Sequence, residues 1–306
     1  MRVAEGTRDA AGVWHPNDPG QYKPMDVHGA LPWSVLRQDS REWQERKKWW
    51  YERGVDDIAP RSAAKSMIST GRHGAISAGV SRFDPHLAEM LYTWFCPPGG
   101  FVIDPLAGGP VRGIVAGSLG LRYVGIDLLS GQISANRRKA EQWNHELIET
   151  PRWDHGDARD VLTGVEDESF DYGLSCPPYW NRERYSDDPR DLSAMSWPRF
   201  LDAHALIILN TVRVLKADSF VTWVVSDVRD SRGHLRSLPA RTVDAFEAAG
   251  ASLTNEQILV GPAGTLAKTM RPAWEACRTT TRRHQIVLTF VKGDRRKATR
   301  RLRADR

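Results

Sequence analysis

Cysteines and long apolar runs are scarce in this sequence, and each scarcity excludes a class of protein. Cys96, Cys176 and Cys277 are the three cysteines among 306 residues, too few and too scattered for a disulfide framework or a four-ligand zinc site. No stretch of about 18 apolar residues could span a bilayer, and residues 1–5 open no signal-peptide pattern. We therefore expect a soluble cytoplasmic protein with free thiols and no membrane partner, encoded by a bacterium or a phage.

Charge and polarity divide the chain into four parts. The hydrophobic content of 41% suffices for a substantial core, and the net charge of +5 permits a polyanionic partner without proving one. Residues 1–39 are polar and rich in Gly, Pro and Asp, which predicts an extended or disordered arm. We expect a basic, aromatic helix and a loop over 40–79, one folded domain over 80–292, and a basic, disordered tail over 293–306.

Residues 40–54 predict a helix that has two open interpretations. Ser40 suits the N-cap and Gly54 suits the stop. The helix interleaves cations with aromatic side chains, a mixture that can hold phosphates and stack bases. In the alternative, which we favour, the tryptophans pack on the body and the basic face is solvated. The residues concerned are Trp43, Arg46, Lys47, Lys48, Trp49, Trp50, Tyr51 and Arg53.

Short apolar runs alternate with helical patterns along the rest of the chain. This alternation predicts an α/β fold with a mostly parallel sheet and helices on both faces. The expected strands are 101–103, 123–126, 169–174, 220–226, 253–260 and 285–291. The expected helices include one that opens at Asp84 and Pro85, and others over 130–145, 197–215 and 241–249.

The most informative stretch is FVIDPLAGGPVRGIVAGSLGLRYVGID, residues 101–127. It predicts a buried strand, a loop of small residues, a helix and a second strand that ends at Asp127, where a carboxylate can accept hydrogen bonds from a ribose. Gly108 and Gly109 are adjacent, unlike the spaced glycines of a dinucleotide-binding loop, and Asp104 would repel a phosphate. A cationic or zwitterionic nucleoside such as S-adenosylmethionine is the better candidate ligand, and a nicotinamide dehydrogenase is the poorer interpretation.

A second informative stretch, SCPPYW at residues 175–180, follows a later expected strand. DPLAGG and SCPPY, about seventy residues apart with YVGID and GDARD between them, resemble the motifs of the amino-methylating S-adenosylmethionine-dependent DNA methyltransferases. In that family the first motif reads D-P-F-x-G-S-G, and the second has Asp, Asn or Ser before P-P-Y, P-P-F or P-P-W. The resemblance covers residues 80–292. It implies a Rossmann-like sheet of seven strands with the last one antiparallel, and methylation of adenine N6 or cytosine N4 in DNA, as in restriction-modification systems.

The resemblance also implies how S-adenosylmethionine is held. The loop over 104–109 would hold its methionine part, Asp127 the ribose hydroxyls, Asp157 the adenine, and residues 81–85 the carboxylate end. The implied cofactor contacts are Phe83, Asp104, Pro105, Ala107, Gly108, Gly109, Asp127, Leu128, Asp157 and Ala158.

Residues 175–179, here called the proline corner, suit the chemistry of an exocyclic amine. Such an amine is a weak nucleophile because its lone pair is delocalised into the ring, so the enzyme must accept its hydrogens and aim its nitrogen at the methyl group. Two prolines fix φ and leave carbonyl acceptors, while an aromatic face stacks on a base turned out of the duplex. No metal is needed for this reaction. The expected catalytic residues are Ser175, Cys176, Pro177, Pro178 and Tyr179.

Cys176 departs from the family pattern, because a neutral thiol is a weak hydrogen-bond acceptor. We favour Cys176 as a spacer, with the Pro177 carbonyl and a neighbour such as Ser175 accepting the amine hydrogens. One alternative is a nucleophilic thiolate that adds to a pyrimidine, as in methylation of cytosine carbon 5. The other is a catalytically weakened protein that binds nucleic acid.

Two segments beyond the corner carry cations that can contact phosphates. They cover residues 181–190 and 261–283, and we interpret both as loops at the carboxyl edge of the sheet, where substrates bind. DNA is the expected partner and RNA the alternative, and the sequence does not indicate an oligomeric state. The expected nucleic-acid contacts are Trp180, Arg182, Arg184, Lys268, Arg271, Arg282 and Arg283.

Overall fold

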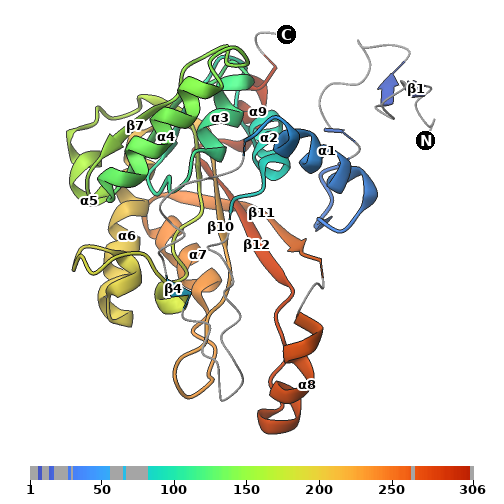
Figure 1. Ribbon diagram of the computed structural model, residues 1–306. Coiled ribbons are helices and arrows are strands. Elements are labelled where there is room, and N and C mark those ends of the chain that lie inside the picture. Colours follow the sequence, from blue (N-terminus) through green and yellow to red (C-terminus); the bar gives the residue numbers. More distant parts are fainter. Residues whose placement is uncertain are drawn as a thin grey trace.

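The computed structural model describes part of the chain, including nearly all of the expected domain. Residues 27–28, 30–55, 82–262 and 270–303 are described in full, and residues 6–8, 14–16, 65–66 and 266–269 by their backbone alone. Within these ranges, helices cover both faces of an eight-stranded sheet (Figure 1). No helix in the described ranges combines the length and the apolar character that a membrane crossing requires. Most of the loop expected before residue 80 lies outside the described residues.

The sheet contains the seven strands that the resemblance implies and one more, and six of the seven lie where the sequence pattern predicts a strand. Its order is β3-β11-β12-β10-β8-β5-β6-β7, and β12 runs antiparallel to both of its neighbours, which confirms the α/β class and the antiparallel last strand. The central strands are β5 (Phe101–Asp104), β6 (Arg122–Asp127), β7 (Arg152–His155), β8 (Phe170–Ser175), β10 (Leu215–Val225), β11 (Ala251–Val260) and β12 (His284–Lys292). The eighth strand, β3 (Val35–Arg37), pairs with β11, so this part of the expected arm joins the sheet edge.

Smaller ladders lie outside the main sheet. The strands β1 (Gly6–Arg8) and β2 (Trp14–Pro16) pair with each other, and β4 (Lys65–Ser66) pairs with β9 (Glu183–Arg184). The second pair brings a segment that precedes the domain in sequence against the segment that follows the proline corner.

Two apolar clusters, one on each face of the sheet, form the core. One contains buried residues of α2, α3, α4 and α9, and the other contains buried residues of α5, α6 and α7. The central strand β8 is buried along its whole length, as expected of a strand covered on both faces. The helices are α1 (Arg41–Glu52), α2 (Pro85–Phe95), α3 (Val111–Ser118), α4 (Ser130–Gln142), α5 (Ala158–Val161), α6 (Trp197–Val214), α7 (Leu238–Ala248), α8 (Leu266–Cys277) and α9 (Arg295–Arg301), with 3-10 turns η2 (Leu162–Gly164), η3 (Trp180–Arg182) and η4 (Leu192–Ala194).

Helix α1 docks on the body through its tryptophans. Ser40 caps the helix as expected, and Trp43 and Trp50 are buried. The indole nitrogen of Trp43 donates to Asp84 Oδ2 over 3.0 Å, and that of Trp50 donates to Glu89 Oε2 over 3.0 Å. The packing interpretation of this helix is therefore confirmed for both tryptophans.

Two segments expected to be irregular contain helices. The tail forms α9, whose N-cap Asp294 accepts a hydrogen bond from the Lys297 backbone, whose Ala298 is buried, and whose Arg301 pairs with Asp171 over 2.5 Å. The prediction of a disordered tail is thus wrong for residues 294–303, because an apolar contact and an ion pair fasten a segment that composition alone marks as solvated. The prediction of a loop over residues 261–283 is likewise wrong for residues 266–277, which form α8.

Glu89 joins α1 to α2 through a buried charge. Its side chain accepts hydrogen bonds from Arg46 Nε and Nη2, over 2.9 and 2.5 Å, and lies 3.3 Å from the ring of His86 and 3.2 Å from that of His28. Burial opposes ionisation of Glu89, but these partners hold the pKa of its carboxyl well below the usual range. The carboxylate is therefore charged in the folded protein at neutral pH.

We predict that Glu89→Gln lowers the free energy of unfolding by about 3 kcal/mol at pH 7, since it leaves Arg46 largely buried without its counter-charge. A folded-state pKa below the unfolded value means that this contribution is present at neutral pH and is lost as pH falls below about 4.3, so the difference from wild type should narrow there. Urea unfolding at several pH values measures it. Glu45→Gln removes an exposed partner of Arg41 and should change stability by less than about 0.5 kcal/mol; equal effects of the two substitutions would contradict the prediction.

Candidate active site

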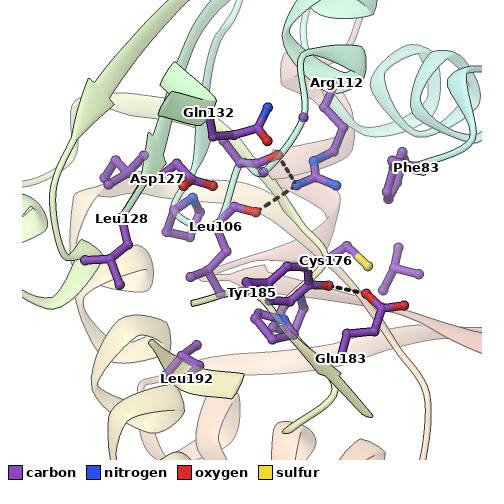
Figure 2. Close-up of a pocket in the computed structure, with 18 of the residues that line it drawn as sticks. Phe83, Leu106, Arg112, Asp127, Leu128, Gln132, Cys176, Glu183, Tyr185 and Leu192 are labelled. Carbon is purple, nitrogen blue, oxygen red and sulfur yellow. Dashed lines mark hydrogen bonds between the residues drawn. The ribbon is translucent and has the colours of Figure 1, made fainter. Parts of the chain in front are cut away.

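The carboxyl ends of β5, β6 and β8 meet at one edge of the sheet, because these strands are parallel neighbours. The segments that follow them enclose a cavity of about 320 Å³ (Figure 2). Gly108 belongs to the loop over residues 104–109, here called the glycine loop, and Pro178 belongs to the proline corner. Both residues line this cavity. The two motifs recognised in the sequence therefore form one site.

All but one of the expected cofactor contacts line the cavity. The exception is Asp104, whose side chain is completely buried beneath it. The expected contacts that do line the cavity are Phe83, Pro105, Ala107, Gly108, Gly109, Asp127, Leu128, Asp157 and Ala158. Residue 81 lies outside the described residues, and Arg82 takes part in lining the same cavity.

Asp104 braces the site from below, so the expectation of direct cofactor contact is corrected. Its Oδ2 accepts from Arg112 Nε over 2.6 Å and from the Tyr123 hydroxyl over 2.8 Å, and its Oδ1 accepts from Ser175 Oγ over 2.7 Å. These partners come from α3, β6 and β8. One carboxylate thus ties the glycine loop to the strand that carries the proline corner, and its charge is matched by a cation rather than presented to a ligand.

Arg112 shapes the glycine loop and was missed in the sequence. Its Nη2 donates to the carbonyl oxygens of Leu106 and Ala107, over 2.8 and 2.9 Å. Burial opposes its charge, but the adjacent Asp104 raises the pKa of the guanidinium above its ordinary value. The sequence did carry one signal for this role. Arg112 lies on the apolar face of an expected helix, eight residues after Asp104.

Gly108 adopts a backbone conformation with φ of +52°, which suits glycine, and its carbonyl accepts from Asn136 Nδ2 over 2.8 Å. Gln132 in turn donates to Asn136 over 2.7 Å. Across the loop, a Cβ on Gly125 would lie 2.7 Å from that of Ala107, so the second strand needs a glycine for the loop to pack against it. Side chains from α4 thus hold the loop, and spacing alone did not reveal them.

Asp127 and Asp157 place two carboxylates in the cavity wall. Asp127 ends β6, and its Oδ1 accepts from the backbone of Leu129 over 2.8 Å. Asp157 caps α5 and accepts from Arg159 Nε over 2.9 Å. Burial opposes ionisation of Asp157, but the hydrogen bonds from Arg159 hold the pKa of its carboxyl below the usual value. Both groups are acceptors suited to hydroxyl or amino donors of a nucleoside.

The proline corner places Cys176, Pro177, Pro178 and Tyr179 in the cavity wall, but not Ser175. Ser175 is fully buried, and its hydroxyl donates to Asp104, so the expectation that it accepts amine hydrogens is wrong. Alternation along β8 explains this, since residue 175 points to the opposite side from residue 176.

Tyr179 is held in place from two sides. Its hydroxyl oxygen accepts from Gln285 Nε2 over 2.6 Å and lies 3.3 Å from Cys176 Sγ. Burial raises the pKa of the Cys176 thiol. A nucleophilic cysteine needs the opposite shift, so the environment counts against methylation of cytosine carbon 5 and favours a neutral thiol.

The segment after the corner adds polar groups to the wall that sequence reasoning did not assign. Tyr185 donates from its hydroxyl to Glu183 Oε2 over 2.5 Å (Figure 2). Lys47 of α1 also reaches the cavity, where its Nζ lies 3.0 Å from Asp84 Oδ2. Lys47 and Asp84 are far apart in sequence, so spacing carried no signal for that contact.

The expected nucleic-acid contacts have different surroundings. Arg182 lines the cavity, whereas Trp180 packs against Trp197 and donates from its indole to the Met195 carbonyl over 3.0 Å. The side chain of Lys268 lies outside the described residues.

The remaining expected contacts are arginines that have acidic neighbours. Arg184 lies 2.8 Å from Asp187, Arg271 2.7 Å from Glu275, Arg282 3.7 Å from Asp227 and Arg283 2.7 Å from Asp39. Arg271 lies on α8, which projects from the body (Figure 1).

Comparison with known proteins confirms the resemblance to methyltransferases. No protein-family model matches the chain. Over 139 residues it is 30% identical to the type II methyltransferase M.BglII of Bacillus subtilis, which covers 45% of this chain, so the chain spans about a third of the length of that curated relative. Among solved structures, TrmN from Thermus thermophilus is similar over 69% of this chain and 49% of its own, with 15% identity and a TM-score of 0.48. A protein described as a DNA modification methylase, also from Thermus thermophilus, is similar over 45% of this chain and 51% of its own, with 21% identity and a TM-score of 0.34.

We predict that Cys176 is alkylated more slowly than Cys277, by at least about tenfold, when the folded protein meets iodoacetamide at pH 7.5, because the thiolate is the reacting form and Cys277 is exposed. Peptide mass analysis over time measures both rates. Buried Cys96 should stay unmodified, and all three should react alike after unfolding in guanidinium chloride. If Cys176 reacts as fast as Cys277 in the folded protein, its thiol is not held neutral.

Proposed function

We propose that this chain transfers a methyl group from S-adenosylmethionine to an exocyclic amine of DNA, either adenine N6 or cytosine N4. One observation carries the proposal: a single cavity contains the glycine loop, the carboxylates of Asp127 and Asp157, and the proline corner ending at Tyr179. A methyl donor and an acceptor base need such a shared space, because the nitrogen must approach the methyl carbon in line with the breaking bond.

The residues at one end of the cavity fit the cofactor. Asp127 suits the ribose hydroxyls, and Asp157 suits the adenine amino group. The backbone at Gly108 permits close approach, and Phe83 presents a ring whose centroid lies 4.6 Å from the Arg112 guanidinium carbon. When bound, S-adenosylmethionine supplies the electrophilic methyl group. These side chains would hold and orient it.

The other end of the cavity fits a base turned out of a duplex. Pro177 and Pro178 have no N–H to compete for the amine, and their carbonyls are acceptors. Tyr179 is held by Gln285 and Cys176, so its ring is a rigid surface for stacking. This rigidity supports catalysis by positioning rather than covalent attack.

DNA as the substrate is supported by the cations that surround this edge. Arg182 lines the cavity, and α8 projects from the body with exposed Arg271 and with Trp274 at 46% exposure, followed directly by exposed Arg278. An exposed helix with cations and an aromatic ring can contact phosphates and bases. The type II methyltransferase among the relatives supports a role in restriction-modification.

Methyl transfer from radiolabelled S-adenosylmethionine to unmodified DNA, followed by mass analysis of the nucleosides, tests the proposal. Label in N6-methyladenine or N4-methylcytosine is the expected result. Label in RNA but not in DNA, or at cytosine carbon 5, would replace the proposed substrate or position. Binding of nucleic acid without S-adenosylmethionine binding would leave a binding protein in place of an enzyme.

We predict that Asp127→Asn weakens S-adenosylmethionine binding by about 10- to 100-fold, the loss expected for hydrogen bonds to a charged acceptor. The amide oxygen can still accept from the Leu129 backbone, so the loop should keep its shape. Isothermal titration calorimetry measures the affinity. Asp154→Asn removes a carboxylate that lies on the neighbouring strand β7 and pairs with Arg152, and it should bind within about twofold of wild type. Unchanged affinity in Asp127→Asn would remove the assigned ribose contact.

We also predict that DNA affinity falls steeply as salt rises, with a linear relation between the logarithms of affinity and salt concentration. Arg271→Ala should weaken binding and reduce the magnitude of this slope by about 1, because one phosphate contact is lost. Fluorescence anisotropy at 50 to 200 mM salt, roughly the range over which such contacts weaken strongly, measures both quantities. Arg152→Ala changes an exposed arginine at the amino end of β7 and should leave the slope unchanged. A flat salt response of the wild type would contradict phosphate contact.

A further inference from the structure

The proline corner lacks a strong side-chain acceptor at the position where the family that it resembles has one. Cys176 occupies that position, and burial keeps its thiol neutral and therefore a poor acceptor. Ser175 cannot substitute, because its hydroxyl is fully buried and donates to Asp104. The Pro177 carbonyl can accept one hydrogen of a target amine, so the other hydrogen must find a partner elsewhere in the cavity if the proposed reaction is to occur there.

Five carboxylates line the cavity, and most of them are already occupied. They are Asp84, Asp127, Asp157, Glu183 and Asp191. Asp84 has Lys47 Nζ at 3.0 Å, and Asp157 accepts from Arg159. Asp191 caps η4 and accepts from both the backbone and the hydroxyl of Ser193, over 2.8 and 2.7 Å. Asp84 and Asp191 thus serve the fold, and Asp157 belongs to the end of the cavity proposed for the cofactor.

Asp127 and Glu183 lie at opposite sides of the cavity. Figure 2 shows Asp127 beside Leu128 at the cofactor end, whereas Glu183 lies on the side of Cys176. Burial is the main cause of the raised pKa of the Cys176 thiol, and the charge of Glu183 adds to it, which agrees with this placement. Glu183 is therefore the carboxylate at the end where the target base would lie.

Two contacts fix Glu183 in this position. Its backbone belongs to β9, where it pairs with Ser66 of β4, and the Tyr185 hydroxyl donates to Oε2 over 2.5 Å. Among the residues that the structure describes, no lysine or arginine forms an ion pair with Glu183. Within the described residues, the side chain of Glu183 is thus oriented by a neutral donor and has no cationic partner, which suits a hydrogen-bond acceptor for an amine.

We propose that Glu183 accepts a hydrogen of the target amine, in the role that the residue before P-P-Y has in the resembling family. The assignment rests on the proposed function.

Before transfer, the carboxylate accepts an N–H hydrogen bond and aims the nitrogen lone pair at the methyl carbon. The N–C bond then forms as the S–C bond breaks, and the bond pair returns to sulfur, which becomes a neutral thioether. The nitrogen, now positively charged, releases one proton to the Glu183 carboxylate, from which it passes to water. Tyr185 acts as a positioning residue.

Single-turnover methyl transfer at saturating S-adenosylmethionine and DNA tests this role. Glu183→Gln keeps the size of the side chain but cannot take up the proton, so the rate should fall by at least about 100-fold, while cofactor affinity stays within about twofold. Asp187→Asn removes an exposed carboxylate of the same segment and should keep a rate within about threefold of wild type.

A second variant restores the acceptor at the position of the family motif. Cys176→Asp in the Glu183→Gln background should recover at least about tenfold of the lost rate, since the new carboxylate stands at the corner itself. Should Glu183→Gln fail to fold, Glu183→Asp keeps the carboxylate but withdraws it by one methylene group, and it should transfer the methyl group more slowly than wild type.

The outcomes separate this assignment from the proposed function. A Glu183→Gln rate within about threefold of an active wild type would overturn the role of Glu183 and leave the methyltransferase proposal standing. A wild type that binds no S-adenosylmethionine, or methylates no nucleic acid, would overturn the proposed function itself and the role of Glu183 with it. A folded Glu183→Asp as fast as wild type would also count against the assignment.

Discussion

The buried carboxylate of Asp104 is the constraint on which the candidate site depends. Its partners Arg112, Tyr123 and Ser175 belong to three different elements, so one charge sets the distance between the glycine loop and the proline corner. An unpaired charge at this depth would cost far more than the fold can supply, and the guanidinium of Arg112 removes that cost while it holds two loop carbonyls. In the sequence Asp104 resembles a ligand contact, but in the structure it holds the glycine loop and the strand β8 together.

The same principle organises the rest of the cavity. Gly108 is held by Asn136, and Tyr179 is held by Gln285 of the antiparallel strand β12. Each contact spans elements that the chain order separates, and each fixes a group whose placement the proposed chemistry requires. Rigid placement of acceptors and aromatic faces is what methyl transfer between two bound molecules needs, because neither strong acid nor a covalent intermediate takes part.

The cations counted in the sequence were a weaker guide to binding partners than the ion pairs that form in the folded protein. The basic, aromatic helix α1 resembles a nucleic-acid element, yet Arg46 pairs with Glu89 and its neighbouring tryptophan donates to the same carboxylate. The basic tail likewise folds as α9 and pairs Arg301 with Asp171. Composition counts cations but does not show which of them meet an acidic partner on folding, and such pairs need tertiary contacts.

Residue pattern alone determined the α/β class, the six strands β5, β6, β8, β10, β11 and β12, and the meeting of the two motifs at the carboxyl edge, because apolar periodicity and strand order are local properties that constrain topology strongly. It also indicated where Asp127 and Asp157 lie. Only the tertiary structure decided that Asp104 and Ser175 face away from the cavity, that Arg112 shapes the loop, and that Glu183 stands near Cys176. The physical reason is that side-chain partners are chosen by proximity in space, and a residue's neighbours across the sheet leave no trace in its spacing along the chain.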